Sequence, residues 1–445
     1  MGKLFGTDGV RGVANSELTP EMAFQLGKAG AQVLKKDTEN PAIIIGRDTR
    51  ISGGMLEAAL TAGICSVGVD VISVGVIPTP GIAYLTRTHQ VMGGVMVSAS
   101  HNPVADNGIK FFAENGFKLS DSVEDQIEEL LQVEVDKDNV PIGGEVGEVR
   151  AYPEGVQEYV NFLKNTVEAD LSGVKIVLDC ANGAAYQVAP QVFEELGAEV
   201  IKTHCEPNGL NINHNCGSTH LESLQDNVVK YGADLGLAFD GDADRVLAVD
   251  EKGEVVDGDQ ILAICASNLK EQDLLAENLL VVTVMSNLGL YQACERLDIS
   301  VSQTKVGDRY VLEEMLKSGS ILGGEQSGHI IYLEHNTTGD GVLTGLLLLS
   351  VMTGKKENLA QLKGVMEKLP QVLVNVTVKN KRNLDKVAEI NNVIEEAKAQ
   401  LDGRGRILVR ASGTEPLVRV MAEGPDMAEL EEVTNKIAAV IKQKV

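Results

Sequence analysis

The sequence lacks the features of a membrane-spanning or exported protein. Its longest near-apolar stretch, Gly341 to Gly354, lies between charged residues and is too short to span a bilayer, so it predicts a buried helix. The first residues, MGKLFGTDGVRG, contain no apolar run of the kind found in signal peptides. We therefore expect a cytoplasmic protein with no membrane partner.

Paired cysteines and excess positive charge are lacking as well. No two of the six cysteines form a CxxC pair, which is typical of reduced thiols in a cytosolic protein and not of a disulfide framework. Lys and Arg number 39 against 64 Asp and Glu, a net charge of −25. A nucleic-acid partner is excluded, because such proteins need a basic face. A site for an anionic substrate must then be built locally from a few Arg and Lys residues.

A chain of 445 residues is too long for one simple core and predicts several domains. A pattern of apolar run, turn, amphipathic helix and second apolar run occurs three times, beginning near Ala42, Lys175 and Leu279. Units of this kind predict parallel strand pairing with right-handed crossovers. The fold class we expect is α/β, with three similar mixed-sheet domains and a C-terminal α+β domain around a central cleft.

Each of the three units is followed by another short apolar run that ends in an unusual loop. These loops begin at Ser98, Asp240 and Glu325. Strands of α/β folds deliver their functional loops at their carboxyl ends, so the three loops are expected to meet in one site. The last segment has a different order, β-α-β-β-α. The predicted domains are 1–155, 156–253, 254–368 and 369–445.

Three carboxylates stand at alternate positions in the loop Asp240-Gly-Asp242-Ala-Asp244-Arg245. In an extended segment they would point to one side. Two carboxylates about 4 Å apart repel by roughly 4 kcal/mol at an effective dielectric near 20, so three need a cation. Oxygen ligands with open positions suit Mg²⁺. The alternative is a solvated acidic turn. An EF-hand fits less well, because Arg245 stands where such a loop needs Gly.

The loop Ser98-Ala-Ser100-His101-Asn102-Pro103 follows a buried strand. A serine exposed at a strand end can act as a nucleophile, and a phosphoserine would complement a neighbouring Mg²⁺. Taken alone, the loop is more often a polar turn than a nucleophile loop. A Ser-His-Asp hydrolase is disfavoured, because there is no G-x-S-x-G motif and adjacent Ser100 and His101 are expected to point apart.

Two further loops carry donors for a phosphosugar. One is Arg410-Ala-Ser412-Gly413-Thr414, with Arg419 nearby, which offers hydroxyls, guanidinium groups and a glycine-freed backbone to a phosphate. It is also the turn of a hairpin. The other runs from Glu325 through Ser327 to His329 and suits sugar hydroxyls, although a histidine in a loop is more often structural.

Together, in this order, the four loops resemble the α-D-phosphohexomutase superfamily over the whole chain. The resemblance includes Phe5-Gly-Thr-Asp-Gly-Val-Arg11-Gly12 and Lys305-Val-Gly-Asp308-Arg309-Tyr310. It implies four domains with a mobile fourth, a phosphorylated Ser100, and one Mg²⁺ held by Asp240, Asp242, Asp244 and the serine phosphate. It also implies sugar binding at Glu325, Ser327, His329 and Arg309, and phosphate binding at Arg410, Ser412, Gly413, Thr414 and Arg419.

Gln326 and Asp308 distinguish branches of the superfamily. Phosphomannomutase/phosphoglucomutase enzymes typically carry Met and His at these places, so the chain resembles the branch that acts on glucosamine phosphates. The implied reaction interconverts glucosamine 6-phosphate and glucosamine 1-phosphate through glucosamine 1,6-bisphosphate, which is both intermediate and activator. This reaction would supply the synthesis of UDP-N-acetylglucosamine and the cell wall.

The groups that move protons are left open by the resemblance. Lys110, His101 and His329 are candidates for general acid or base, and Arg245 and Lys110 for balancing negative charge. The partner is a small phosphosugar, and the family implies a homodimer. The rival functions are a phosphoglucomutase or phosphomannomutase, a non-catalytic sugar-phosphate sensor, and a Ca²⁺-binding interaction protein.

Overall fold

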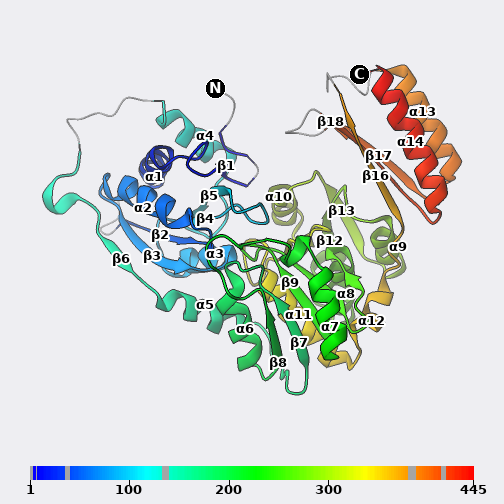
Figure 1. Ribbon diagram of the computed structural model, residues 1–445, viewed down its shortest axis with the longest axis horizontal. Coiled ribbons are helices and arrows are strands. Elements are labelled where there is room, and N and C mark those ends of the chain that lie inside the picture. Colours follow the sequence, from blue (N-terminus) through cyan, green and yellow to red (C-terminus); the bar gives the residue numbers. More distant parts are fainter. Residues whose placement is uncertain are drawn as a thin grey trace. The chain divides into compact units, whose positions relative to one another are not determined.

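The protein is described from a computed structural model that covers residues 4–6, 8–35, 41–132, 140–378, 387–411 and 417–444. Its contacts divide the chain into two compact units. The first unit comprises Met1–Met285 and Ile299–Val365, and the second comprises Ser286–Asp298 and Met366–Val445. Each unit is described by itself below, and Figure 1 labels the elements of both.

The first sheet of the first unit has six strands in the order β1-β5-β4-β2-β3-β6. β2 pairs in parallel with β3 and β4, and β5 is antiparallel to β4 and β1. The strands are β1 (Val10–Val13), β2 (Ala42–Arg47), β3 (Asp70–Val76), β4 (Gly93–Val97), β5 (Asp106–Ala113) and β6 (Val149–Ala151). The helices of this part are α1 (Pro20–Leu34), α2 (Gly53–Cys65), α3 (Thr79–Thr88) and α4 (Asp121–Leu130).

The second sheet has five strands in the order β11-β10-β9-β7-β8. Here too the first strand of the repeated pattern, β7, pairs in parallel with the two that follow. The strands are β7 (Lys175–Asp179), β8 (Glu199–Thr203), β9 (Leu235–Phe239), β10 (Val246–Asp250) and β11 (Val255–Val256). The helices are α5 (Glu154–Lys164), α6 (Ala185–Glu195) and α7 (Glu222–Tyr231).

The third sheet has four strands in the order β13-β12-β14-β15, and β12 pairs in parallel with β13 and β14. The strands are β12 (Leu279–Thr283), β13 (Ser300–Thr304), β14 (Leu322–Gly324) and β15 (Ile330–Tyr332). The helices are α8 (Gly258–Glu271), α10 (Asp308–Ser318), α11 (Gly341–Lys355) and α12 (Leu359–Leu362). The parallel pairing predicted for the three repeats is therefore confirmed.

The second unit contains the β-α-β-β-α segment expected at the carboxyl end, together with α9 (Leu288–Arg296). Its sheet has the order β16-β18-β17, and all pairs are antiparallel. The elements are β16 (Gln371–Thr377), α13 (Ala388–Leu401), β17 (Arg406–Ala411), β18 (Leu417–Glu423) and α14 (Met427–Lys444). Ile390, Val420 and Ile437 belong to a core that the two helices share with the sheet.

Helix starts in the first unit follow from local sequence. Thr19 precedes Pro20 and accepts a hydrogen bond from the Met22 N–H at the start of α1. Asp257 and Gln260 form a capping box at the start of α8. α11 contains the longest near-apolar stretch and is largely buried, as predicted. Among the described residues, no helix has the length and apolar character needed to cross a bilayer.

Close packing of α1 against α2 depends on glycine. A Cβ on Gly63 would lie 2.1 Å from the Phe24 carbonyl oxygen, and one on Gly27 would lie 2.4 Å from that of Leu60. We predict that Gly63→Ala lowers the free energy of unfolding by about 1–3 kcal/mol, because one backbone must move away from the other. Urea denaturation followed by circular dichroism measures this change.

Gly54→Ala is the matched control, because Gly54 lies in the same helix and its added Cβ meets no atom within 4 Å. This variant is expected to keep the wild-type stability or to gain up to about 1 kcal/mol. Equal losses in the two variants would contradict the close approach of α1 and α2.

Candidate active site

Ser100 lies just beyond the end of β4 and is buried, with 1% of its surface exposed. Its backbone is left-handed, with φ 53°, a conformation that costs a non-glycine residue about 1–3 kcal/mol. The Ser100 hydroxyl donates a hydrogen bond of 2.5 Å to Asp240 Oδ2. The nucleophile candidate and the acidic loop, 140 residues apart in the chain, therefore meet in the first unit.

Arg50 binds the backbone of the loop that carries Ser100. Its buried guanidinium donates to the carbonyl oxygens of Ser100 at 2.9 Å and Asn102 at 2.8 Å, and also to those of Pro103 and Asp106. Asp48 accepts from the same guanidinium at 2.8 Å, and both side chains are fully buried. Buried carbonyl groups need donors, so one guanidinium satisfies most of this loop and fixes the position of Ser100.

The acidic loop follows β9 and is a turn, not the extended segment that we assumed. The Ala243 N–H donates to the Asp240 carbonyl at 3.1 Å, and Ala243 has φ 56°. The three carboxylates nevertheless converge, because the turn folds them inward: one ligand atom from each lies within 4.8 Å of the others. A Cβ on Gly241 would lie 2.5 Å from the Ser100 carbonyl oxygen, so only glycine allows this approach.

Lys110 on β5 provides the compensating charge for the acidic loop. Its ammonium lies 2.8 Å from Asp242, 3.4 Å from Asp244 and 3.1 Å from Asp8. Burial lowers the pKa of Lys110, but these carboxylates outweigh it and raise the pKa well above the usual value. Lys110 is therefore a cation that holds its proton tightly and is suited to balancing charge.

The carboxylates of the triad differ in their proton affinity. Burial, with the charges of Asp244 and Asp242, raises the pKa of Asp240 well above its usual value. Burial acts in the same direction on Asp244, but Lys110, His329 and Arg245 outweigh it and lower the pKa of Asp244 far below the usual value. The turn thus concentrates negative charge at one end, next to its cations.

The expectation that Ser100 and His101 point apart is wrong. His101 Nδ1 lies 3.2 Å from Ser100 Oγ, because the left-handed backbone at Ser100 turns the two neighbouring side chains toward one another. Arg245 donates to the same nitrogen at 3.1 Å. Burial and the nearby Arg245 and Arg11 charges lower the pKa of His101 to about 4, so its imidazole is neutral.

The loop between β14 and β15 brings His329 to the triad. His329 Nδ1 lies 3.6 Å from Asp244, and Nε2 lies 3.7 Å from Asp308. Burial lowers the pKa of His329, but these two carboxylates outweigh it and the pKa is raised. In the same loop, Glu325 accepts a hydrogen bond from the Gly307 N–H at 3.1 Å, and Ser327 is exposed.

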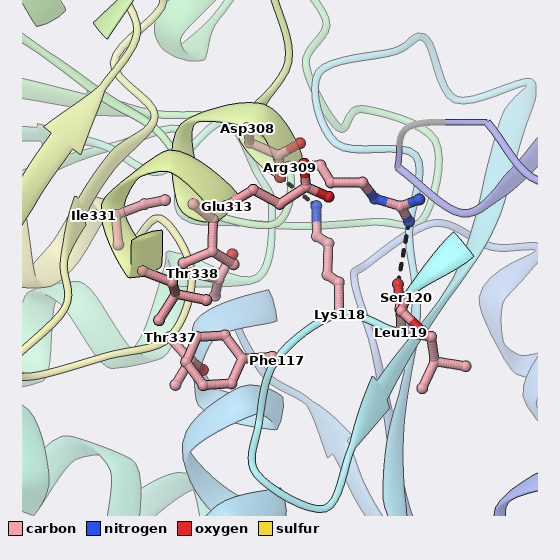
Figure 2. Close-up of a pocket in the computed structure, with 12 residues that line it drawn as sticks. Phe117, Lys118, Leu119, Ser120, Asp308, Arg309, Glu313, Ile331, Thr337 and Thr338 are labelled. Atoms are coloured by element: carbon pink, nitrogen blue, oxygen red, sulfur yellow. Dashed lines mark hydrogen bonds and ion pairs between the residues drawn. The ribbon is translucent and has the colours of Figure 1, made fainter. Parts of the chain in front are cut away.

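Arg309 has protein partners in this structure. Its guanidinium donates to Glu124 at 2.7 Å and to Asp121, and it also reaches the Leu119 carbonyl at 3.3 Å. Figure 2 shows Arg309 and its contact with the Leu119 carbonyl at a pocket of roughly 200 Å³ between α10 and the loop around Lys118. Substrate binding by Arg309 remains a prediction, and it would require the guanidinium to exchange partners.

Several residues of this network escaped the sequence analysis. Thr79 donates from its hydroxyl to Asp242 Oδ2 at 2.6 Å and from its N–H to the Asp242 carbonyl at 2.9 Å. Asp8 forms ion pairs with Lys110, Lys118 and Arg11, and Lys118 also pairs with Asp308. Asp8 lies in the GTDGVRG segment, whose resemblance to the family could have identified Asp8 as a site residue. No sequence motif marks Thr79 or Lys118.

In the second unit, Arg410 on β17 and Arg419 on β18 are direct cross-strand partners. Like charges directly opposite one another destabilise a strand pair, and an anion between them would relieve this cost. Burial together with the Arg419 charge lowers the pKa of Arg410. Ser412, Gly413 and Thr414 lie outside the described residues.

The donor set of the acidic loop fits a hard divalent cation. Asp242 Oδ1 and Asp244 Oδ1 are buried and have no hydrogen-bond partner within the described structure. Each of these two carboxylates therefore has one oxygen that could bind a cation. Carboxylate oxygens are the ligands that Mg²⁺ prefers, and such sites leave positions for phosphate oxygens. The buried triad can therefore bind a metal.

Comparisons with known proteins agree with this arrangement. Phosphoglucomutase/phosphomannomutase family models match in chain order: alpha/beta/alpha domain I at residues 2–137, domain II at 157–253, domain III at 257–369 and the C-terminal domain at 373–440. A phosphoglucomutase/phosphomannomutase family protein from Burkholderia thailandensis has the same fold, with a TM-score of 0.82 at 24% identity, covering 99% of this chain and 98% of that one. The fold class predicted from the sequence is confirmed, and the chain is a phosphohexomutase by class.

Two further relatives concern amino sugars. The phosphoglucosamine mutase of Desulforamulus reducens is 60% identical over 444 residues, covering 99% of each chain. The structure of Aspergillus fumigatus N-acetylphosphoglucosamine mutase in complex with GlcNAc-6P and magnesium has a TM-score of 0.72 at 18% identity, covering 99% of this chain and 95% of that one. The chain belongs to the phosphoglucosamine mutases, a family of isomerases.

The role of Arg50 yields a stability prediction. Arg50→Ala leaves Asp48 buried without its cation and several carbonyl groups without donors, so the free energy of unfolding should fall by about 3–5 kcal/mol. Arg47→Ala is the matched control, because Arg47 pairs with Glu57 at a half-exposed position and should lose at most about 1 kcal/mol. Similar losses in urea denaturation would show that Arg50 has no special structural role.

Proposed function

We propose that this chain interconverts glucosamine 6-phosphate and glucosamine 1-phosphate by relaying a phosphoryl group through Ser100. The observation that carries the proposal is the 2.5 Å contact between Ser100 Oγ and Asp240 inside the buried carboxylate triad. A hydroxyl beside three carboxylates is an unfavourable surrounding for a phosphate unless a divalent cation is shared between them. The relatives that match the whole chain support the choice of amino sugar.

One Mg²⁺ per chain would be held by Asp240, Asp242 and Asp244 together with the phosphate carried by Ser100. Bound there, Mg²⁺ would neutralise phosphate charge and polarise the transferring group. The buried Oδ1 atoms of Asp242 and Asp244 support this ligand set. Lys110 and Thr79 both donate to Asp242 Oδ2, so Oδ1 is the oxygen of Asp242 that would face the cation.

The transfer itself is a pair of exchanges at Ser100 Oγ. In the first, the bond between phosphorus and Ser100 Oγ breaks as a bond to the sugar 1-hydroxyl oxygen forms. The 1-hydroxyl loses its proton to a general base and Ser100 Oγ takes up a proton, which yields glucosamine 1,6-bisphosphate. The intermediate then reverses its orientation. In the second exchange, Ser100 Oγ takes the 6-phosphoryl group, and the sugar 6-oxygen leaves with a proton as glucosamine 1-phosphate.

Proton transfers fall to the three candidates according to their charge. Lys110 is held as a cation by its carboxylate partners and balances charge, whereas His329, whose pKa is raised by Asp244 and Asp308, is the candidate for donating a proton to a leaving oxygen. His101 is neutral and its Nδ1 lies 3.2 Å from Ser100 Oγ, but this nitrogen already accepts from Arg245, so accepting the serine proton would require Arg245 to release it. Arg245 holds the imidazole in that orientation and adds positive charge near Asp244.

Recognition of the substrate is assigned to two sets of residues. Glu325, Ser327, His329 and Arg309 would bind the sugar hydroxyl and amino groups. Arg410 and Arg419, with Ser412, Gly413 and Thr414, would bind the phosphate that is not being transferred. The like-charged pair of Arg410 and Arg419 supports this second assignment, because an anion would stabilise it. The assembly as a homodimer, the cytoplasmic location and the role in UDP-N-acetylglucosamine and cell-wall synthesis remain predictions.

Replacement of the nucleophile tests the relay. Ser100→Ala should abolish isomerisation of glucosamine 6-phosphate and also the mass increment of a bound phosphoryl group, as measured by coupled assay and intact-protein mass spectrometry. Ser66→Ala is the control, because Ser66 Oγ bonds to the Gly63 carbonyl at the end of α2 and should leave both readouts unchanged. Near-wild-type turnover of Ser100→Ala in the presence of added bisphosphate would exclude the relay.

Replacement of a ligand tests the metal. Asp242→Asn should lower turnover by about 100-fold or more and abolish the response to added Mg²⁺ after chelation, because a carboxylate ligand is lost. Asp226→Asn removes an exposed carboxylate on α7 and should retain the wild-type magnesium titration. An unaltered magnesium response in Asp242→Asn would show that the triad does not bind the Mg²⁺.

A further inference from the structure

A second cluster of metal-ligating side chains lies at the carboxyl edge of the second sheet. Asp179 is the last residue of β7, His204 directly follows β8, and Cys216 lies in the loop beyond. One ligand atom from each of the three lies within 4.8 Å of the others. These residues are 24 or more positions away from the Asp240 loop and take no part in the phosphoryl transfer proposed above.

Contacts within the cluster arrange its ligand atoms. His204 Nδ1 lies 2.9 Å from Asp179 Oδ2, while Asp179 Oδ1 accepts the Ala181 N–H at 2.9 Å and so fixes the carboxylate. Asp179 and Cys216 are fully buried, whereas the His204 side chain is 28% exposed. The cluster thus has two interior ligands and one at the surface, which gives an ion a route of entry beside the imidazole.

The chemistry of this set differs from that of the active site. Thiolate and imidazole ligands are soft or intermediate and select Zn²⁺ and similar transition-metal ions, whereas the all-oxygen triad suits Mg²⁺. An Asp, a His and a Cys are all common ligands of tetrahedral Zn²⁺, and three protein ligands leave a fourth position open. On binding, the Cys216 thiol loses its proton to solvent, and the carboxylate and thiolate together neutralise the dication.

Loops that border the cluster also brace the active site. The Asn213 N–H donates to the Ala181 carbonyl at 2.9 Å, and the Asn213 side chain donates to the Ser100 carbonyl at 2.9 Å. The Ala184 N–H donates to the Gly241 carbonyl at 2.8 Å. An ion that joins β7, β8 and the Cys216 loop would therefore stabilise the backbone on which the serine loop and the acidic loop rest.

We propose that Asp179, His204 and Cys216 form a second metal site, specific for Zn²⁺-class ions and separate from the magnesium site. The ion is structural: it ties the loop that carries Asn213 to the end of β7. Binding there does not require isomerase activity, so the site stands or falls independently of the proposed function.

Cobalt is the probe, because a thiolate bound to Co²⁺ gives an intense near-ultraviolet charge-transfer band that an all-oxygen site does not. The full-length, reduced and chelator-treated protein is titrated with Co²⁺, and Zn²⁺ is then added. We expect the band to saturate at one ion per chain, to disappear on addition of Zn²⁺, and to persist in Asp242→Asn. Absence of a thiolate band in the wild-type protein would overturn the proposal.

Variants of the ligands test the assignment. Cys216→Ser should lose the band, and Cys65→Ser, which removes another buried thiol in the first unit, should keep it. His204→Asn is the second ligand variant, since a half-exposed residue with φ 48° tolerates Asn and the protein should remain folded. It should weaken Co²⁺ binding by at least about ten-fold. A band that survives in Cys216→Ser, or a Co²⁺ affinity that is unchanged in His204→Asn, would also overturn the proposal.

Discussion

The site depends on the burial of three carboxylates next to one serine hydroxyl. Two like charges at about 4 Å cost roughly 4 kcal/mol at an effective dielectric near 20, so the turn at Asp240 is tolerated only with compensating charge. Lys110 supplies it in the structure, through ion pairs of 2.8 Å and 3.4 Å to Asp242 and Asp244. The same electrostatic demand makes this turn receptive to a divalent cation and to a phosphorylated Ser100.

The backbone near this charge is held in conformations that need support. Ser100 and Ala243 both have positive φ, and Gly241 approaches the Ser100 carbonyl too closely for any side chain. Arg50 and Asn213 donate to that same carbonyl, one from within the first sheet's domain and the other from beside the second sheet. Strain at the nucleophile is therefore offset by buried hydrogen bonds that reach it from two sides.

Charge also separates the roles of the basic groups. Asp242 and Asp244 keep Lys110 protonated, and Asp244 and Asp308 raise the pKa of His329, whereas burial together with Arg245 and Arg11 keeps His101 neutral. Acid and base functions are thus distributed by the neighbours of each group and not by its residue type. A soft-ligand cluster at Asp179 extends this logic, since it lies at the same sheet edge yet offers sulfur and nitrogen in place of oxygen.

The sequence by itself determined the α/β architecture and the family. Short apolar runs and amphipathic helices are local patterns, so the three parallel repeats and the β-α-β-β-α segment followed from them. The four loops with Ser100, Asp240, Glu325 and Arg410 were distinctive enough to indicate phosphosugar chemistry. The fold could be predicted because the order of strands and helices along the chain determines which strands pair in parallel and at which sheet edge the loops lie.

Only the tertiary structure decided the surroundings of each group. Thr79, Asp8 and Lys118 join the site through contacts across long stretches of chain, and no spacing rule links them to Asp242 or Asp308. The contact between Ser100 and His101 was missed because a left-handed backbone cannot be inferred from residue type alone. The pKa of each group could not be predicted from the sequence either, because burial and neighbouring charges set it and these arise only when the chain folds.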